Sequence, residues 1–147
     1  SKGVYDVTSV AAVGIAAHEA GHAVQYAVGY SPIKLRTAII PVTQIGSTLS
    51  WPLLLIGLAL GNQLLATAGV VLFCAVVLFQ LVTLPVEFNA SRRAVAAIEE
   101  GGILYDDEII GAKKTLRAAA LTYVAAAATS LAQLLRLLAI YGRRRRD

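Results

Sequence analysis

The chain has 147 residues, a length that suits one domain better than two. Charged residues make up 15% of it, apolar residues make up 57%, and the net charge is +4. A soluble protein carries about 25% charged residues, and a domain this small cannot bury so much apolar surface internally. The composition therefore excludes a disordered chain and argues against a soluble globule, so lipid or a large partner must cover the rest.

The basic residues gather at the edges of apolar runs and are not interleaved with aromatic residues along one face. These edge clusters are Lys34 with Arg36, Arg92 with Arg93, Lys113 and Lys114 with Arg117, and the arginines at 143–146. Membrane proteins place their interfacial charge in this way, whereas nucleic-acid binders present a basic face. We therefore expect a lipid bilayer as a partner and no nucleic acid.

The first predicted element is a helix over about residues 9–28, in which small and apolar residues dominate and after which Gly29 ends the pattern. Three residues can cap its N-terminus, namely Asp6, Thr8 and Ser9. This helix contains the sequence motif that points to a chemical function.

That motif is the H-E-x-x-H pattern at 18–22, which uses the only two histidines of the chain. Helical spacing places His18 and His22 on one face, where both can reach one metal ion, while Glu19 is turned to touch a metal-bound water without being a ligand. Two neutral imidazoles hold a zinc ion, the ion lowers the pKa of its water towards about 7, and the carboxylate passes the water's proton to the leaving amine. The pattern predicts one zinc ion per chain, with Glu19 as the general base.

Two membrane spans are expected next, as a helical hairpin. Positions 37–86 carry no charge, and these 50 positions are about right for two helices across roughly 30 Å of hydrocarbon. Gly61 and Asn62 supply the break, which gives spans over about 45–60 and 64–84. Because no carboxylate stands within them, cleavage inside the bilayer by a site completed in a span is disfavoured.

A catalytic zinc needs a third protein ligand. Pro85 is expected to close the second span and to signal a further helix over about 86–100, with Glu87 at its start. The hairpin returns the chain to the face at which it entered, so Glu87 emerges beside the histidine helix and is the favoured ligand. Arg92 and Arg93 can hold its carboxylate or that of a substrate.

The last apolar run covers about 118–140, is rich in alanine, and is either a third span or a packed interfacial helix. The acidic residues between Glu99 and Glu108 read as a solvated stretch around a Gly101-Gly102 turn. The expected fold is all-α: an integral membrane helical bundle, forming a single metallopeptidase domain over 1–147, with the active-site helix packed beside the transmembrane hairpin.

Four separated blocks of the sequence together resemble the YugP-type membrane-bound neutral zinc metallopeptidases in order and spacing. The blocks are 3–6, 17–23, 84–94, and 111–114 with 118–124. By analogy with the gluzincin peptidases, the resemblance implies zinc bound by His18, His22 and Glu87, with Glu19 as the general base. It also implies an N-terminal membrane helix, and we expect the present sequence, which lacks an initiating Met, to be a fragment or a processed product.

Two positions depart from the pattern. Family members often carry Asp where Asn89 stands, and related gluzincins place Asp where Ser91 stands. Both residues are candidates to contact a ligand histidine from behind, and without a carboxylate there the metal affinity is expected to be weaker.

The group that stabilises the oxyanion of the transition state is left open by the sequence. The candidates are Tyr5, Tyr26, Tyr105, Arg92 and Arg93. Tyr26 lies one turn beyond His22, where it either lines the cleft or packs as an aromatic residue at the interface.

Two functions follow from these patterns. The favoured one is a membrane-embedded zinc endopeptidase that cleaves peptides or membrane-protein segments at the membrane surface, and the alternative is a non-catalytic zinc-binding membrane scaffold or partner-binding subunit. The count of basic residues near the spans favours a bacterial cell membrane protein with its active site on the cytoplasmic face.

Overall fold

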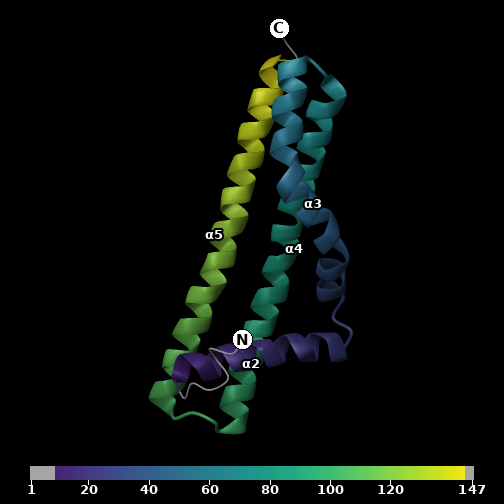
Figure 1. Cartoon of the computed structure of the whole chain (residues 1–147). Coiled ribbons are helices and arrows are strands. Elements are labelled where there is room, and N and C mark those ends of the chain that lie inside the picture. The colour runs from purple at the N-terminus through teal and green to yellow at the C-terminus, as the bar shows by residue number, and fades with distance from the viewer. Residues whose placement is uncertain (1–8, 145–147) are drawn as a thin grey trace. The chain divides into compact units, whose positions relative to one another are not determined.

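The computed structural model describes residues 9–144, and all four regular elements in that range are α-helices (Figure 1). The elements are α2 (Val10–Ala27), α3 (Ser31–Leu60), α4 (Gln63–Gly101) and α5 (Asp106–Arg144). This confirms the all-α fold class. Helices α3, α4 and α5 are each long and apolar enough to cross a membrane.

The chain divides into two compact units, and helices α4 and α5 contribute to both. The first unit consists of the residues up to Lys34 together with Thr83–Val124. The second unit consists of Leu35–Val82 together with the residues from Ala125 onward. The candidate site residues of the sequence all belong to the first unit.

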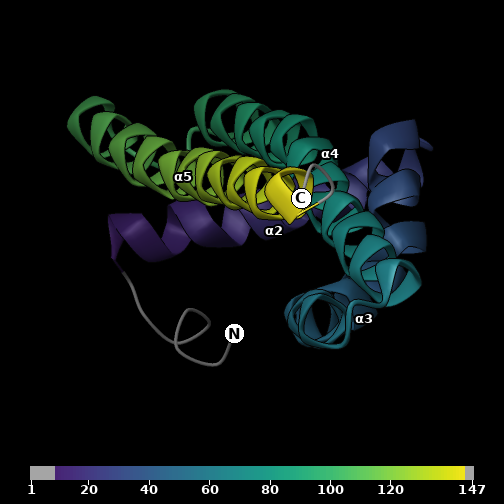
Figure 2. The same cartoon turned by 90° about the horizontal axis from the view of Figure 1, so that it is seen from above.

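In the first unit, α2 packs across α4 and α5, which run beside each other (Figures 1 and 2). Ser9 caps α2, since its side chain accepts a hydrogen bond from the backbone N–H of Ala12 at 3.2 Å. The helix ends at Ala27, and Gly29 follows with φ +69°, a conformation that L side chains rarely adopt. The other expected caps, Asp6 and Thr8, lie outside the described residues.

Pro85 does not close a helix, contrary to the expectation from the sequence. Pro85 lies inside α4, so the apolar stretch and the segment that carries Glu87 form one continuous helix. Likewise, α3 begins at Ser31 and runs through Pro41 and Pro52. Proline removes one backbone donor, but apolar helices accommodate this where neighbouring groups or local adjustments satisfy the freed carbonyl. Glu87 therefore lies within a continuous helix and not at the start of a new one.

The second unit packs α3, α4 and α5 around an apolar core. Its buried members are Leu54, Ala66, Val70, Phe73, Val77 and Leu137. Glycines at 57 and 69 allow α3 and α4 to approach to backbone contact, which is how membrane helices associate. Leu60, Leu64 and Val71 are more than half exposed on the outside of this unit, as is expected for side chains that face lipid.

Candidate metal centre

A backbone contact between α2 and α4 places the histidines against Glu87. A Cβ atom on Gly21 would lie only 2.6 Å from the carbonyl oxygen of Ala90, so the two helices can approach this closely only because residue 21 has no side chain. Ala90 and Ala94 of α4 are both fully buried. Helix α2 thus packs against α4 at Gly21, which is one of the two variable positions of the HExxH pattern.

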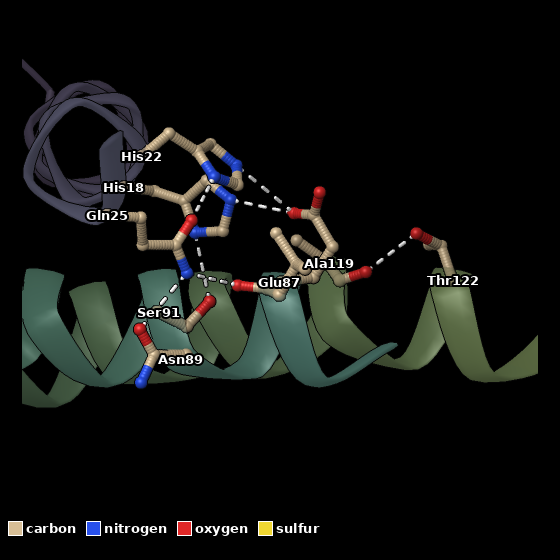
Figure 3. A network of polar contacts seen from close by, with 9 residues as sticks. His18, His22, Gln25, Glu87, Asn89, Ser91, Ala119 and Thr122 are labelled. Atoms are coloured by element: carbon tan, nitrogen blue, oxygen red, sulfur yellow. Dashed lines mark hydrogen bonds and ion pairs between the residues drawn. The ribbon is translucent and has the colours of Figure 1, made fainter. Parts of the chain in front are cut away.

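The three expected metal ligands meet at this contact (Figure 3). His18 Nε2 lies 2.9 Å from Glu87 Oε2, and His22 Nε2 lies 3.5 Å from the same oxygen. The ligand atoms of the three residues all lie within 4.8 Å of one another. Glu87 is 1% exposed, so this carboxylate sits in the protein interior and faces two imidazoles.

Gln25 completes the site, and the sequence analysis did not single it out. Its side chain is fully buried, and its Oε1 atom lies 2.9 Å from His22 Nδ1. Its Nε2 atom donates to the carbonyl oxygen of Val86 at 2.8 Å and to Asn89 Oδ1 at 3.0 Å (Figure 3). A polar residue three positions after the second histidine, on the same helix face, was the signal that could have revealed it.

These contacts fix the orientation of His22. The carbonyl of Val86 can only accept a hydrogen bond, so the amide nitrogen of Gln25 must point towards it and the amide oxygen must point towards His22. His22 Nδ1–H is therefore the donor, and the lone pair of a neutral His22 is on Nε2, directed at Glu87.

This arrangement fits a bound cation. A lone pair on His22 Nε2 and a carboxylate oxygen 3.5 Å away repel each other unless a positive charge lies between them. Ligand atoms about 2.0–2.1 Å from a tetrahedral zinc ion are about 3.3 Å apart. Glu87 Oε2 lies 2.9 Å from His18 Nε2 and 3.5 Å from His22 Nε2, and these two distances lie on either side of that value. The donor set of two imidazoles and one carboxylate is also one that zinc prefers.

His18 also has a partner on α4, which is Ser91. Ser91 Oγ lies 3.0 Å from His18 Nδ1. Asn89 touches Gln25 through its Oδ1 atom, which also accepts a hydrogen bond from Arg93 Nε at 2.8 Å. Both histidines are therefore oriented by neutral groups, a hydroxyl and an amide, where a carboxylate would make the imidazole more basic.

The remaining candidates are not among the three residues that converge. Glu19 is exposed on α2 next to His18. Tyr26 is 52% exposed, and Tyr105 is 81% exposed in the loop before α5. Arg92 is exposed on α4, whereas Arg93 is occupied with Asn89. Tyr5 lies outside the described residues.

Comparison with known families assigns the chain. The model of a family described as "Putative neutral zinc metallopeptidase" matches residues 1–142. The chain belongs to this family. A relative from Bacillus subtilis (strain 168), named "Putative membrane protease YugP", is 47% identical over 141 residues, which is 96% of this chain. The chain spans 63% of the length of that relative. No solved structure matches the chain.

For this member of the family, Gln25→Leu is expected to weaken zinc binding. The variant leaves His22 Nδ1 and the Val86 carbonyl without their partner, so the imidazole is no longer held in its ligand orientation. Loss of such an orienting partner typically lowers metal affinity about 10–100-fold. A zinc-chelator competition titration measures this, with Gln63→Leu in the second unit as the control. Equal zinc affinity of Gln25→Leu and wild type would show that Gln25 does not position His22.

Proposed function

We propose that this chain carries a zinc-dependent endopeptidase site that hydrolyses peptide bonds at a membrane surface. One observation carries the proposal: the two histidines of an HExxH helix converge on the buried carboxylate of Glu87. Three protein ligands leave the open coordination position that a catalytic zinc requires. The membership of the zinc metallopeptidase family supports the same activity.

Each residue has a distinct part in this proposal. His18, His22 and Glu87 would hold the zinc ion, which when bound supplies Lewis-acid chemistry and lets a water lose its proton near neutral pH. Glu19 accepts that proton at its carboxylate and delivers it to the nitrogen of the leaving amine. Glu19 is exposed on α2, which leaves room for a peptide to approach. Glu87 is buried, so water does not compete with the metal ion for its carboxylate.

The alternative, a zinc-binding scaffold, has less support. Structural zinc sites are usually closed by four protein ligands. Within residues 9–144, the candidate group contains three such residues, and the carboxylate that follows His18 is exposed. An available proton acceptor beside an open position is what hydrolysis needs and what a structural site lacks.

The proposed substrates are peptides or membrane-protein segments close to the lipid surface. Three helices long and apolar enough to cross a membrane, and the name of the Bacillus subtilis relative, support a membrane location. We extend this to a bacterial cell membrane with the site on its cytoplasmic face, because eight basic residues flank the apolar runs near the HExxH helix and Glu87, against four in the tail at 143–146. The eight are at positions 2, 34, 36, 92, 93, 113, 114 and 117.

Zinc removal tests the proposal. The protein purified in detergent is expected to cleave a library of quenched fluorescent peptides, to lose this activity when 1,10-phenanthroline removes zinc, and to regain it when one equivalent of zinc is added. Hydrolysis that continues after zinc has been removed completely, as checked by elemental analysis, would contradict a zinc-dependent peptidase.

A further inference from the structure

A second feature of the first unit is a groove between α4 and α5. Its volume is about 610 Å³. Phe88 and Val95 of α4 and Leu116 of α5 give it an apolar floor. Three cationic side chains also line it: Arg92, Lys113 and Arg117. The groove belongs to the face of α4 beside the metal centre, since Ser91 both lines it and contacts His18.

The groove has an excess of positive charge. All three cationic side chains are exposed. Lys113 forms an ion pair with Glu99, and both partners are nearly half exposed, so this pair contributes little and is easily exchanged. Within residues 9–143, Arg92 and Arg117 have no ion-pair partner. An anion with more than one negatively charged oxygen matches this lining.

The cations stand at the ends of apolar helical stretches. Arg117 directly precedes the uncharged run of α5, and Arg92 follows the last residue of the uncharged stretch of α4, Val86, by six residues. Six helical residues correspond to about 9 Å. Along each helix the groove's apolar end, at Phe88 and Ala120, is the end nearer the uncharged stretch. Its charged groups are therefore at the depth of lipid phosphates, and its end at Phe88 and Ala120 lies on the side of the acyl chains.

We propose that this groove binds an anionic phospholipid. The phosphodiester lies among Arg92, Lys113 and Arg117, and an acyl chain lies over Phe88 and Leu116. A lipid matches both kinds of lining, because it joins a phosphodiester, which suits the three cations, to an acyl chain, which suits the apolar floor. An acidic peptide fits less well, because the floor offers its backbone N–H and C=O groups mainly apolar contacts.

Lipid binding does not depend on the peptidase chemistry, so the experiment uses zinc-loaded and zinc-free protein alike. Native mass spectrometry of the delipidated chain in neutral detergent is expected to show one tightly bound phosphatidylglycerol, with at least a tenfold preference over phosphatidylcholine of the same acyl chains. The combined variant Arg92→Gln, Lys113→Gln, Arg117→Gln is expected to lose this preference.

A matched variant separates the groove from general charge. Lys34→Gln, Lys114→Gln, Arg136→Gln removes the same charge from residues that do not line the groove, and it is expected to keep the preference. Circular dichroism establishes that both variants retain their helices. Equal binding of the two lipids to wild type, or equal loss in both variants, would overturn the proposal.

Two competitors of phosphatidylglycerol test whether the groove instead binds a free phosphate or an acidic peptide. Glycerol phosphate presents the headgroup without acyl chains, and an Asp- and Glu-rich peptide presents carboxylates. Neither is expected to displace phosphatidylglycerol at a tenfold excess over it. Displacement by glycerol phosphate would overturn the role of the apolar floor, and displacement by the peptide would assign the groove to substrate.

Discussion

Glu19→Gln is expected to slow peptide hydrolysis strongly and to leave zinc bound. The amide has nearly the shape of the carboxylate but cannot accept the proton of the attacking water. General-base catalysis typically contributes about 10²–10⁴-fold in rate, so kcat is expected to fall by that order. Because Glu19 is exposed and is not one of the three converging residues, the zinc content and the thermal unfolding midpoint are expected to stay at the wild-type values.

Glu100→Gln is the control for Glu19→Gln. Glu100 is another exposed glutamate of the first unit, on α4, and Glu100→Gln is expected to cleave peptides at the wild-type rate. The two variants are compared in the same peptide assay, with zinc measured on the same samples. A Glu19→Gln variant that still cleaves at the wild-type rate would show that another group is the base.

Gly21→Ala is expected to disrupt the zinc site although residue 21 is not a ligand. The added Cβ would stand 2.6 Å from the Ala90 carbonyl oxygen and 3.2 Å from its Cα, both backbone atoms that cannot turn aside. Helix α2 must then move away from α4, by several tenths of an ångström. Metal ligand distances tolerate only about ±0.2 Å, so the loss of zinc affinity is expected to reach at least the order of 10–100-fold.

Gly14 supplies the control on the same helix. A Cβ there would lie 3.6 Å from the Cβ of Ala112, an ordinary van der Waals contact. Gly14→Ala is therefore expected to keep the zinc affinity and to stabilise α2 by up to about 1 kcal/mol through its higher helix propensity. Chelator competition for zinc, with thermal unfolding alongside, tests both variants. Equal zinc affinity in Gly21→Ala and Gly14→Ala would refute the role of the Gly21–Ala90 contact.

His18, His22 and Glu87, which the sequence analysis grouped, also lie together in the structure, whereas the helix that carries Glu87 differs from the expected one. The HExxH pattern is local, so its helix and its pair of histidines follow from spacing alone. Glu87 followed from topology, because a hairpin returns the chain to its starting face. The helical hairpin break at Gly61 and Asn62 is where α3 ends and α4 begins, and Gly61 there has φ +66°.

The features that the sequence did not predict depend on contacts between distant residues. Gln25 matters because it meets Val86, 61 positions away, and no local pattern encodes that meeting. Helix α4 continues through Pro85 because the packing of its apolar residues outweighs the loss of one backbone hydrogen bond. The sequence shows that positions 89 and 91 carry no carboxylate, but only the geometry shows that Ser91 and Gln25 are the groups that contact the histidines.

The zinc content of the purified protein tests the central claim most directly. Elemental analysis would be made on wild type, on His22→Ala and Glu87→Ala, and on Glu100→Ala as the control, after exchange into metal-replete and then metal-free buffer. We expect about one zinc per chain in wild type and Glu100→Ala, and almost none in the two ligand variants. No zinc in wild type, or zinc retained in Glu87→Ala, would contradict a site built from His18, His22 and Glu87.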